Sequence, residues 1–124
     1  LRRVMLVEFK KPGRRDYDDR YSPQNQISEY ITRLQNGDIE DYRNQRVRIA
    51  DDCIFYCYVV ADIVGKLEIH TNGWRTTSDG RGRIQDLNGR FRGVIEIIEW
   101  ADLIKDARLR NLAFIDAAGL QYNN

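Results

Sequence analysis

A glutamate and a lysine stand two positions apart in the stretch LVEFKKPG, which covers residues 6–13. The apolar residues 4–7 suit both faces of a strand, which predicts a strand covered on two sides and ended by the proline-glycine pair. Residues two apart on a strand share a face, so Glu8 and Lys10 project together. Phe9 then points to the opposite side, where we expect it to enter the core.

A carboxylate at the end of a strand is suited to metal chemistry on phosphodiesters. Glu8 can bind Mg²⁺ or Mn²⁺ through oxygen, and the backbone carbonyl of Phe9 can supply a second oxygen ligand. Metal-bound water is a source of hydroxide, and Lys10 is suited to orient that water or to offset charge on the phosphorane. The pair alone does not identify a metal site, because a solvated ion pair at the end of a strand has the same two residues. Such an ion pair contributes about 0–1 kcal/mol to stability.

A helix follows, and it adds two polar side chains. The serine and proline at 22–23 are typical of a helix start, and the asparagine and glycine at 36–37 are typical of its end. The apolar face is formed by Ile27, Tyr30, Ile31 and Leu34. Gln26 and Tyr30 lie one turn apart, near the carboxyl end of the first strand. There Gln26 is placed to bind a phosphate, the water or Lys10, and Tyr30 combines packing surface with a polar hydroxyl. The alternatives are a surface glutamine and a core tyrosine.

The two motifs VEFKKPG and SPQNQISEY resemble the PD-(D/E)xK nuclease superfamily, in its RecB-like branch with glutamine and tyrosine four residues apart. The resemblance maps Glu8 and Lys10 onto the E-x-K pair, and Gln26 and Tyr30 onto Q-x-x-x-Y. It implies an α/β fold with a restriction-endonuclease-like mixed central sheet flanked by helices, a Mg²⁺ or Mn²⁺ cofactor, and DNA as the partner. The first motif also looks like the nuclease domain of Shedu-type anti-phage proteins, and residues 105–120 do so more faintly.

The chain departs from the family pattern in one respect. The other metal-binding acid of the family, usually an aspartate, lies on the strand before E-x-K, where this chain has only Arg2 and Arg3. We therefore expect residues 1–124 to be one nuclease-like domain, truncated at its N-terminal end, without its first helix and strand, and preceded in a longer chain by a regulatory domain. Mg²⁺ gains little from one carboxylate, so this chain alone is expected to be catalytically feeble. An exposed edge would favour a homo-oligomer.

Basic residues are the candidates for contact with a nucleic-acid backbone. The net charge is +1, which gives no global basic field, but the segment 74–93 is rich in arginine. An asparagine-glycine pair predicts a tight hairpin between residues 81–87 and 90–100. Such contacts position a nucleic acid without reading its sequence, and a solvated surface is an equal alternative for each residue. The candidates are Lys11, Arg33, Arg81, Arg83, Arg90 and Arg92.

The remaining chain completes an alternating pattern. Residues 53–61 predict a buried strand whose Cys53 and Cys57 are reduced core residues. Short helices are expected within residues 39–44 and 62–72, and a C-terminal amphipathic helix follows from Trp100 to a closing glycine, Gly119. The chain shows no signal peptide and no apolar run of about 20 residues, so we expect a cytoplasmic protein with no membrane partner.

The residues predict metal-dependent hydrolysis of phosphodiesters, and the resemblance implies an endonuclease that acts on DNA in bacterial anti-phage defence. Glu8 would be the metal ligand, Lys10 the charge-stabilising group, Gln26 the organiser of the site and Tyr30 its support. The alternative is a catalytically inactive, nuclease-like module for nucleic-acid binding or oligomerisation. An exposed apolar patch and the absence of a second acid near Glu8 would favour that alternative.

Overall fold

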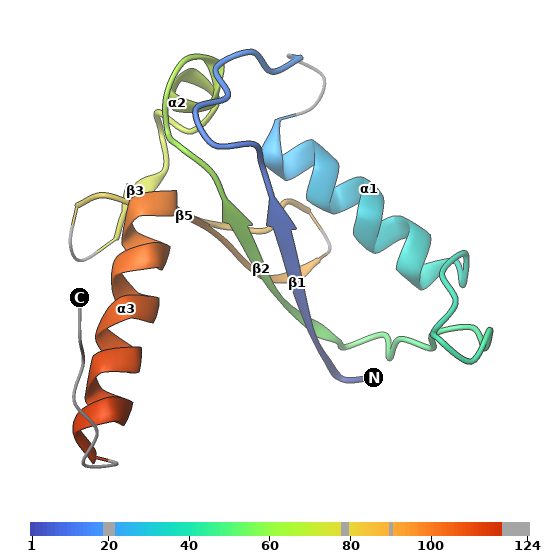
Figure 1. Cartoon of the computed structure of the whole chain (residues 1–124). Helices are drawn as coiled ribbons and strands as arrows, with labels where there is room; N and C mark the ends of the chain where they lie inside the picture. Colours follow the sequence, from blue (N-terminus) through green and yellow to red (C-terminus); the bar gives the residue numbers. More distant parts are fainter. Residues whose placement is uncertain (19–21, 78–79, 90, 118–124) are drawn as a thin grey trace.

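A computed structural model describes residues 1–18, 22–77, 80–89 and 91–117, with side chains as far as Leu109. These residues form a five-stranded sheet with helices beside it (Figure 1). The strands are β1 (Arg3–Phe9), β2 (Ile54–Val60), β3 (Arg75–Thr76), β4 (Arg83–Asp86) and β5 (Arg92–Ile98). The helices are α1 (Pro23–Gln35), α2 (Lys66–His70) and α3 (Trp100–Ala117).

The sheet is mixed, as the sequence predicts. Its strand order is β1-β2-β5-β4-β3, with β1, β2 and β5 parallel and with β4 and β3 antiparallel. The predicted strand over residues 53–61 is β2, and the predicted hairpin is β4–β5, turning through Gly89 at a φ of 64°. The short strand β3 was not predicted. Within the described residues β1 is an outer strand, so one of its edges has no neighbouring strand.

The core lies between α1 and one side of the sheet, which we call the inner face. On α1 the buried residues Ile27, Ile31 and Leu34 recur at helical spacing. The strand residues of the inner face are Val4, Leu6 and Glu8 of β1, Phe55, Cys57 and Val59 of β2, and Ile95 and Ile97 of β5. Ser22 caps α1, and its Oγ accepts a hydrogen bond from the Asn25 amide at 3.4 Å. The predicted start and end of this helix are confirmed.

The opposite side of β1 and β2 is apolar but open, and we call it the open face. Its most exposed residues are Met5, Val7, Phe9 and Tyr56. The predictions that β1 is covered on both sides and that Phe9 enters the core are therefore wrong, since Phe9 is 61% exposed. The reason is the course of α3, which begins at Trp100 beside Phe9, with ring centroids 5.7 Å apart, and then runs away from the sheet (Figure 1). Ile104, on the next turn of α3, is also exposed.

Of the two short helices that the sequence predicts, one is present and the other is not. The helix expected within residues 62–72 is α2. The helix expected within residues 39–44 is wrong, because the segment forms a turn closed by a bridge between Glu40 and Arg46. Asp41 explains the difference: its Oδ1 accepts hydrogen bonds from two amides two and four positions later, at 2.8 and 3.0 Å. Such local bonds compete with the helical ones.

The C-terminal helix and the cysteines agree with expectation. The helix α3 starts at Trp100 as predicted, whereas Gly119 lies outside the described residues. Cys53 and Cys57 are both buried and free. Burial raises the pKa of the Cys57 thiol to about 12. In the part of the chain that the structure describes, no helix combines the length and the apolar character needed to cross a membrane.

Candidate functional site

Lys10 follows directly after β1, and its amide, its carbonyl and its side chain all have partners within the protein. Its amide donates to the carbonyl of Val60 at 2.8 Å, and its carbonyl accepts from the indole Nε1 of Trp100 at 2.9 Å. Its side chain is only 8% exposed, which is unusual for lysine. The backbone contacts hold the residue in place, and the ammonium group must find its partners inside the protein.

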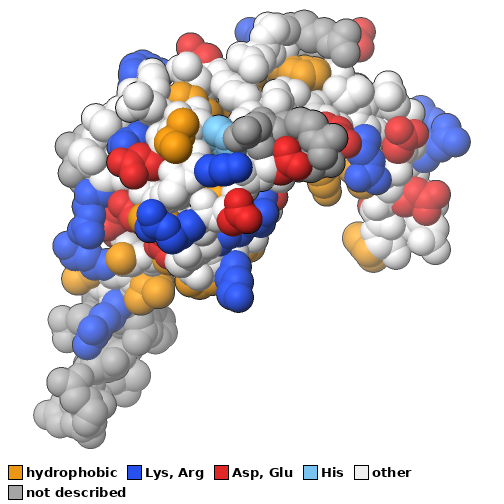
Figure 2. Space-filling model, turned by 90° about the horizontal axis from the view of Figure 1, so that it is seen from above, with side chains coloured by type: hydrophobic (Ala, Val, Ile, Leu, Met, Phe, Trp, Pro, Cys, Tyr) orange, Lys and Arg blue, Asp and Glu red, His pale blue; other side chains and the backbone are white. Residues whose placement is uncertain are grey.

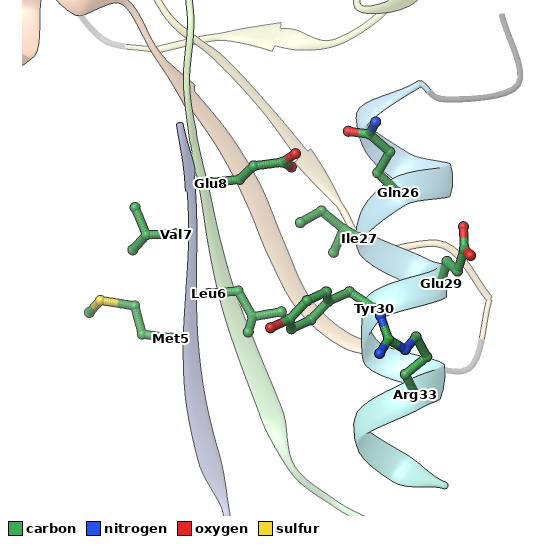
Figure 3. Close-up of a pocket in the computed structure, with 9 residues that line it drawn as sticks. All are labelled: Met5, Leu6, Val7, Glu8, Gln26, Ile27, Glu29, Tyr30 and Arg33. Atoms are coloured by element: carbon green, nitrogen blue, oxygen red, sulfur yellow. The ribbon is translucent and has the colours of Figure 1, made fainter. Parts of the chain in front are cut away.

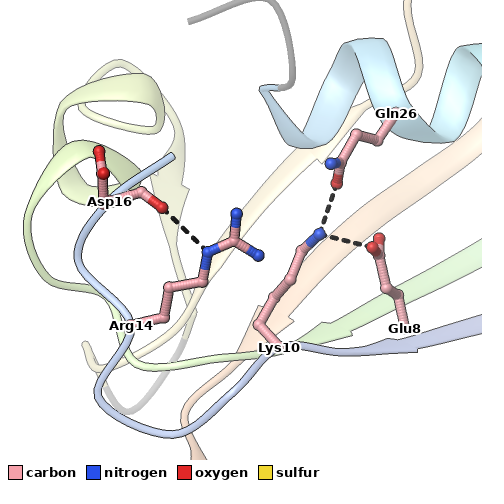
Figure 4. Close-up of polar contacts among 5 residues, drawn as sticks. All are labelled: Glu8, Lys10, Arg14, Asp16 and Gln26. Atoms are coloured by element: carbon pink, nitrogen blue, oxygen red, sulfur yellow. Dashed lines mark hydrogen bonds and ion pairs between the residues drawn. The ribbon is translucent and has the colours of Figure 1, made fainter. Parts of the chain in front are cut away.

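Those partners are two of the predicted site residues. Lys10 Nζ donates to Glu8 Oε1 at 2.5 Å and to Gln26 Oε1 at 2.7 Å, as Figure 4 shows. Glu8 lies two residues away on the same strand, but Gln26 comes from α1, 16 residues later. The structure therefore brings the E-x-K strand and the first turns of the helix to one point. An ammonium has three donors, so these two bonds leave one donor for a ligand.

A groove opens beside this cluster, between the free edge of β1 and α1 (Figure 3). Its volume is about 550 Å³, and its lining includes Glu8 and Gln26 at one end and Arg33 at the other. The ring of Tyr30 extends over Leu6 in the middle of the groove. Tyr30 is 45% exposed, so it presents ring surface to a ligand while its helix neighbours form the core. Arg33 is exposed and is available to a charged ligand.

The carbonyl of Phe9, the second predicted metal ligand, is directed away from β2. Backbone groups alternate in direction along a strand, and the amide of Ile54 bonds to the carbonyl of Arg2 at 3.0 Å while the Lys10 amide bonds to β2. The even-numbered residues of β1 therefore face β2, and the odd-numbered ones face the free edge. The Phe9 carbonyl thus lies at the free edge of β1, one residue from Glu8, whose side chain is on the inner face.

These ligands do not make a magnesium site by themselves. Among the described residues no group of three or more histidine, cysteine, aspartate or glutamate side chains gathers to hold a metal. Glu8 is a single carboxylate, and one of its oxygens is already paired with Lys10. Mg²⁺ prefers more oxygen ligands than one carboxylate and one carbonyl provide. A metal centre here requires at least one further carboxylate beside Glu8.

The motifs missed two residues next to this cluster, Tyr17 and Asp62. The segment after Gly13 is rich in charged residues, but Tyr17 within it is 3% exposed and belongs to the core. The Arg14 guanidinium lies over the Tyr17 ring, with its carbon 4.4 Å from the ring centroid. The Tyr17 hydroxyl has no hydrogen-bond partner among the described residues. An aromatic residue within a charged loop was the signal that could have indicated an anchor.

The pKa of Tyr17 is affected by two carboxylates. Burial raises the pKa of Tyr17, the Arg14 guanidinium lowers it, and the carboxylates of Asp62 and Glu8 raise it further. Asp62 follows β2 and accepts a hydrogen bond from the Gly13 amide at 2.6 Å. The negative charges that act on Tyr17 thus come from the ends of β1 and β2.

The predicted nucleic-acid contacts are dispersed. The strand register places Arg83 level with Glu8 on the inner face, three strands away and so at about 14 Å. Arg92 lies at the other end of the sheet, level with the start of β1. Arg81 forms an ion pair with Asp102 at 3.2 Å. Lys11 is exposed beside the cluster, and Arg90 lies outside the described residues. Figure 2, which looks onto the carboxyl ends of the parallel strands, shows acidic and basic side chains interspersed.

No protein-family model matches the chain, and neither a curated protein nor a solved structure matches it. The resemblance to nucleases therefore depends on the two sequence motifs and on the geometry that joins them.

Proposed function

We propose that the chain is a nuclease domain that hydrolyses DNA phosphodiester bonds with a divalent metal ion, and that Glu8, Lys10 and Gln26 form its site. The observation that supports the proposal is the position of the Lys10 ammonium. It is 8% exposed and lies between a carboxylate of its own strand and an amide of α1. A solvated surface ion pair, the alternative from sequence, needs neither this burial nor the second partner from a helix.

The chain's own groups have separate tasks in this proposal. The remaining donor of Lys10 binds an oxygen of the scissile phosphate and stabilises the charge that develops on it. Gln26 holds the ammonium toward the groove, since its own oxygen is 2.7 Å from Nζ. Arg33 and the ring of Tyr30 bind the substrate further along the groove. The resemblance to Shedu-type proteins suggests a role in anti-phage defence.

A divalent ion enters this site only together with another carboxylate. The open edge beside the Phe9 carbonyl is the place where a neighbouring acid-bearing strand would bring that carboxylate next to Glu8. We therefore expect the chain alone to cut DNA slowly or not at all, and a longer form with such a strand to cut it efficiently.

The test is cleavage of plasmid and linear DNA with Mg²⁺ or Mn²⁺. It compares this chain with a form extended upstream by about one strand and one helix at typical element lengths. In the extended form, Lys10→Ala should lower the cleavage rate by about 10²–10³-fold, the loss typical of a charge-stabilising donor. Lys105→Ala is the matched control, because this lysine is exposed on α3, outside the cluster and outside the candidate DNA contacts. Equal effects of the two substitutions, or no cleavage by a folded extended form, would contradict the proposal.

A second function is favoured by a different observation. Met5, Val7 and Phe9 on the open face are 67%, 48% and 61% exposed, and the described residues place no complete metal group near Glu8. The exposed apolar side chains are a sign expected of a catalytically inactive module for nucleic-acid binding or oligomerisation. That function requires DNA binding or self-association by the folded chain, with no cleavage by any form that carries a second acid.

A further inference from the structure

We propose that the free edge of β1 and the groove beside it bind a second copy of this chain, whose β1 pairs antiparallel with the first. The inference names the surface for the oligomerising alternative, and it does not depend on nuclease activity. The occupant is specified by three features of the described residues: the direction of the backbone groups on β1, the side chains that these residues carry, and the order of charges along the groove.

The backbone of β1 is ready to accept a strand. The carbonyl of Arg2 and the amide of Lys10 bond to β2, so the groups of the residues in alternate register point outward. The outward residues are Arg3, Met5, Val7 and Phe9. The strand contains no lysine, proline or bulge, three of the features that protect an outer strand from pairing. Four of the seven residues of β1 thus present outward backbone groups to a neighbour.

The side chains of β1 suit pairing with an identical strand. An antiparallel pair centred on Leu6 uses the whole strand and places Met5 opposite the partner's Val7, on the open face. The same register places Arg3 opposite the partner's Phe9, where the guanidinium can lie on the exposed ring. Opposite pairs of this kind are the unit of stabilisation in antiparallel sheets. The exposed apolar side chains of both copies would then form one continuous patch.

The charges along the groove favour the antiparallel direction. Arg2 precedes β1 and Arg3 begins it, whereas Glu8 stands near its end. On α1 Glu29 and Arg33 line the same groove, with Arg33 at the end of the groove away from Glu8 (Figure 3). A two-fold axis between the strands therefore brings the basic end of each groove to the acidic end of the other. A parallel pair would bring like charges together on both elements.

The contact is small, so the dimer should be weak. A stable interface buries about 800 Å² per partner, and one strand pair with one groove is at or below that size. We expect a dissociation constant on the order of 10 µM. Sedimentation velocity and light scattering over about 1–300 µM of the chain would cover this range.

The test uses one disruptive substitution and one charge exchange. Val7→Lys keeps an exposed position exposed in the monomer, and it should raise the dissociation constant at least tenfold. Glu29→Arg and Arg33→Glu should each weaken the dimer, and their combination in one chain should restore it, because the exchanged charges again meet across the axis. Tyr42→Lys is the control, because Tyr42 is 87% exposed outside this surface.

Two results would overturn the inference. One is a monomer throughout the concentration range. The other is a dimer that Val7→Lys leaves unchanged, or one whose charge reversals are not corrected by the double exchange. Because the readout is mass in solution, its failure is distinguishable from the absence of DNA cleavage.

Discussion

The buried ammonium of Lys10 predicts an asymmetry between two substitutions in the same ion pair. Glu8→Ala leaves a cation that is 8% exposed with only the Gln26 oxygen as a partner. Lys10→Met leaves a carboxylate whose side chain is 36% exposed, which water can solvate. The apolar stem of methionine also retains the packing of the lysine stem. We therefore expect Glu8→Ala to destabilise the protein more than Lys10→Met.

The magnitudes follow from what each variant leaves unpaired. Loss of a charge-assisted hydrogen bond with a buried cation left behind should cost about 2–3 kcal/mol for Glu8→Ala. Lys10→Met should cost about 1 kcal/mol, since the remaining Glu8 reaches solvent. The double variant leaves no buried charge and should also cost about 1 kcal/mol. Adding Lys10→Met to Glu8→Ala should thus recover between about 1 and 2 kcal/mol.

Urea unfolding measures these differences. Trp100 bonds to the Lys10 carbonyl at 2.9 Å, so its fluorescence reports on the site, and circular dichroism checks that unfolding is two-state. Lys11→Met is the control and should change the free energy of unfolding by less than about 0.5 kcal/mol. If Lys10→Met costs as much as Glu8→Ala, or if the double variant is the sum of the two, the buried cation is not what organises this site.

Three further predictions concern the fold. Phe55→Ala should cost about 3–5 kcal/mol in urea unfolding because Phe55 is 1% exposed, whereas Phe9→Ala should cost less than about 1.5 kcal/mol; equal costs would contradict the open face. Gly93→Ala should prevent stable folding, as judged by circular dichroism, because its Cβ would lie 1.9 Å from the Phe55 carbonyl oxygen; a native-like variant would contradict this strand contact. The Cys57 thiol, with its pKa raised to about 12, stays protonated in the folded chain while the unfolded thiol ionises from about pH 8.5. Its contribution to stability is therefore complete below that pH and falls as pH rises, by up to about 1.4 kcal/mol per unit, and Cys57→Val should remove this part of the slope between pH 8.5 and 10.5.

The elements that the sequence predicts correctly are those with local signals. The serine-proline start of α1, the asparagine-glycine turn before β5 and the β-branched run of β2 each determine structure through nearby residues. The meeting of Lys10 with Gln26 also follows from local order, because a helix that follows a strand through one loop returns along it. The segment 39–44 fails because the Asp41 side chain offers the backbone local bonds that compete with a helix.

The parts that the sequence could not predict depend on distant partners. An apolar run predicts that a strand is suited to burial on both faces, but it does not show what covers each face. Phe9 is exposed because α3 turns away from the sheet after Trp100, and nothing in the run around Phe9 encodes that direction. Tyr17 is buried although charged residues surround it in sequence, because its partners include Arg14 nearby and the core side chains of distant elements.

The two proposals compete for one surface of the molecule. An acid-bearing strand beside Glu8 and the β1 of a second copy both need the outward backbone groups of Met5 and Val7, and each group can serve one neighbour in a sheet. In the antiparallel pair the residue opposite Glu8 is the partner's Val4, which offers no ligand to a metal. Self-association through β1 and a complete metal site therefore exclude each other. An extended form that cuts DNA should not self-associate through this edge. In that form Val7→Lys should leave the oligomeric state in solution unchanged. A protein that is paired through β1 and still cleaves DNA at the same concentration would show that one of the two assignments of this edge is wrong.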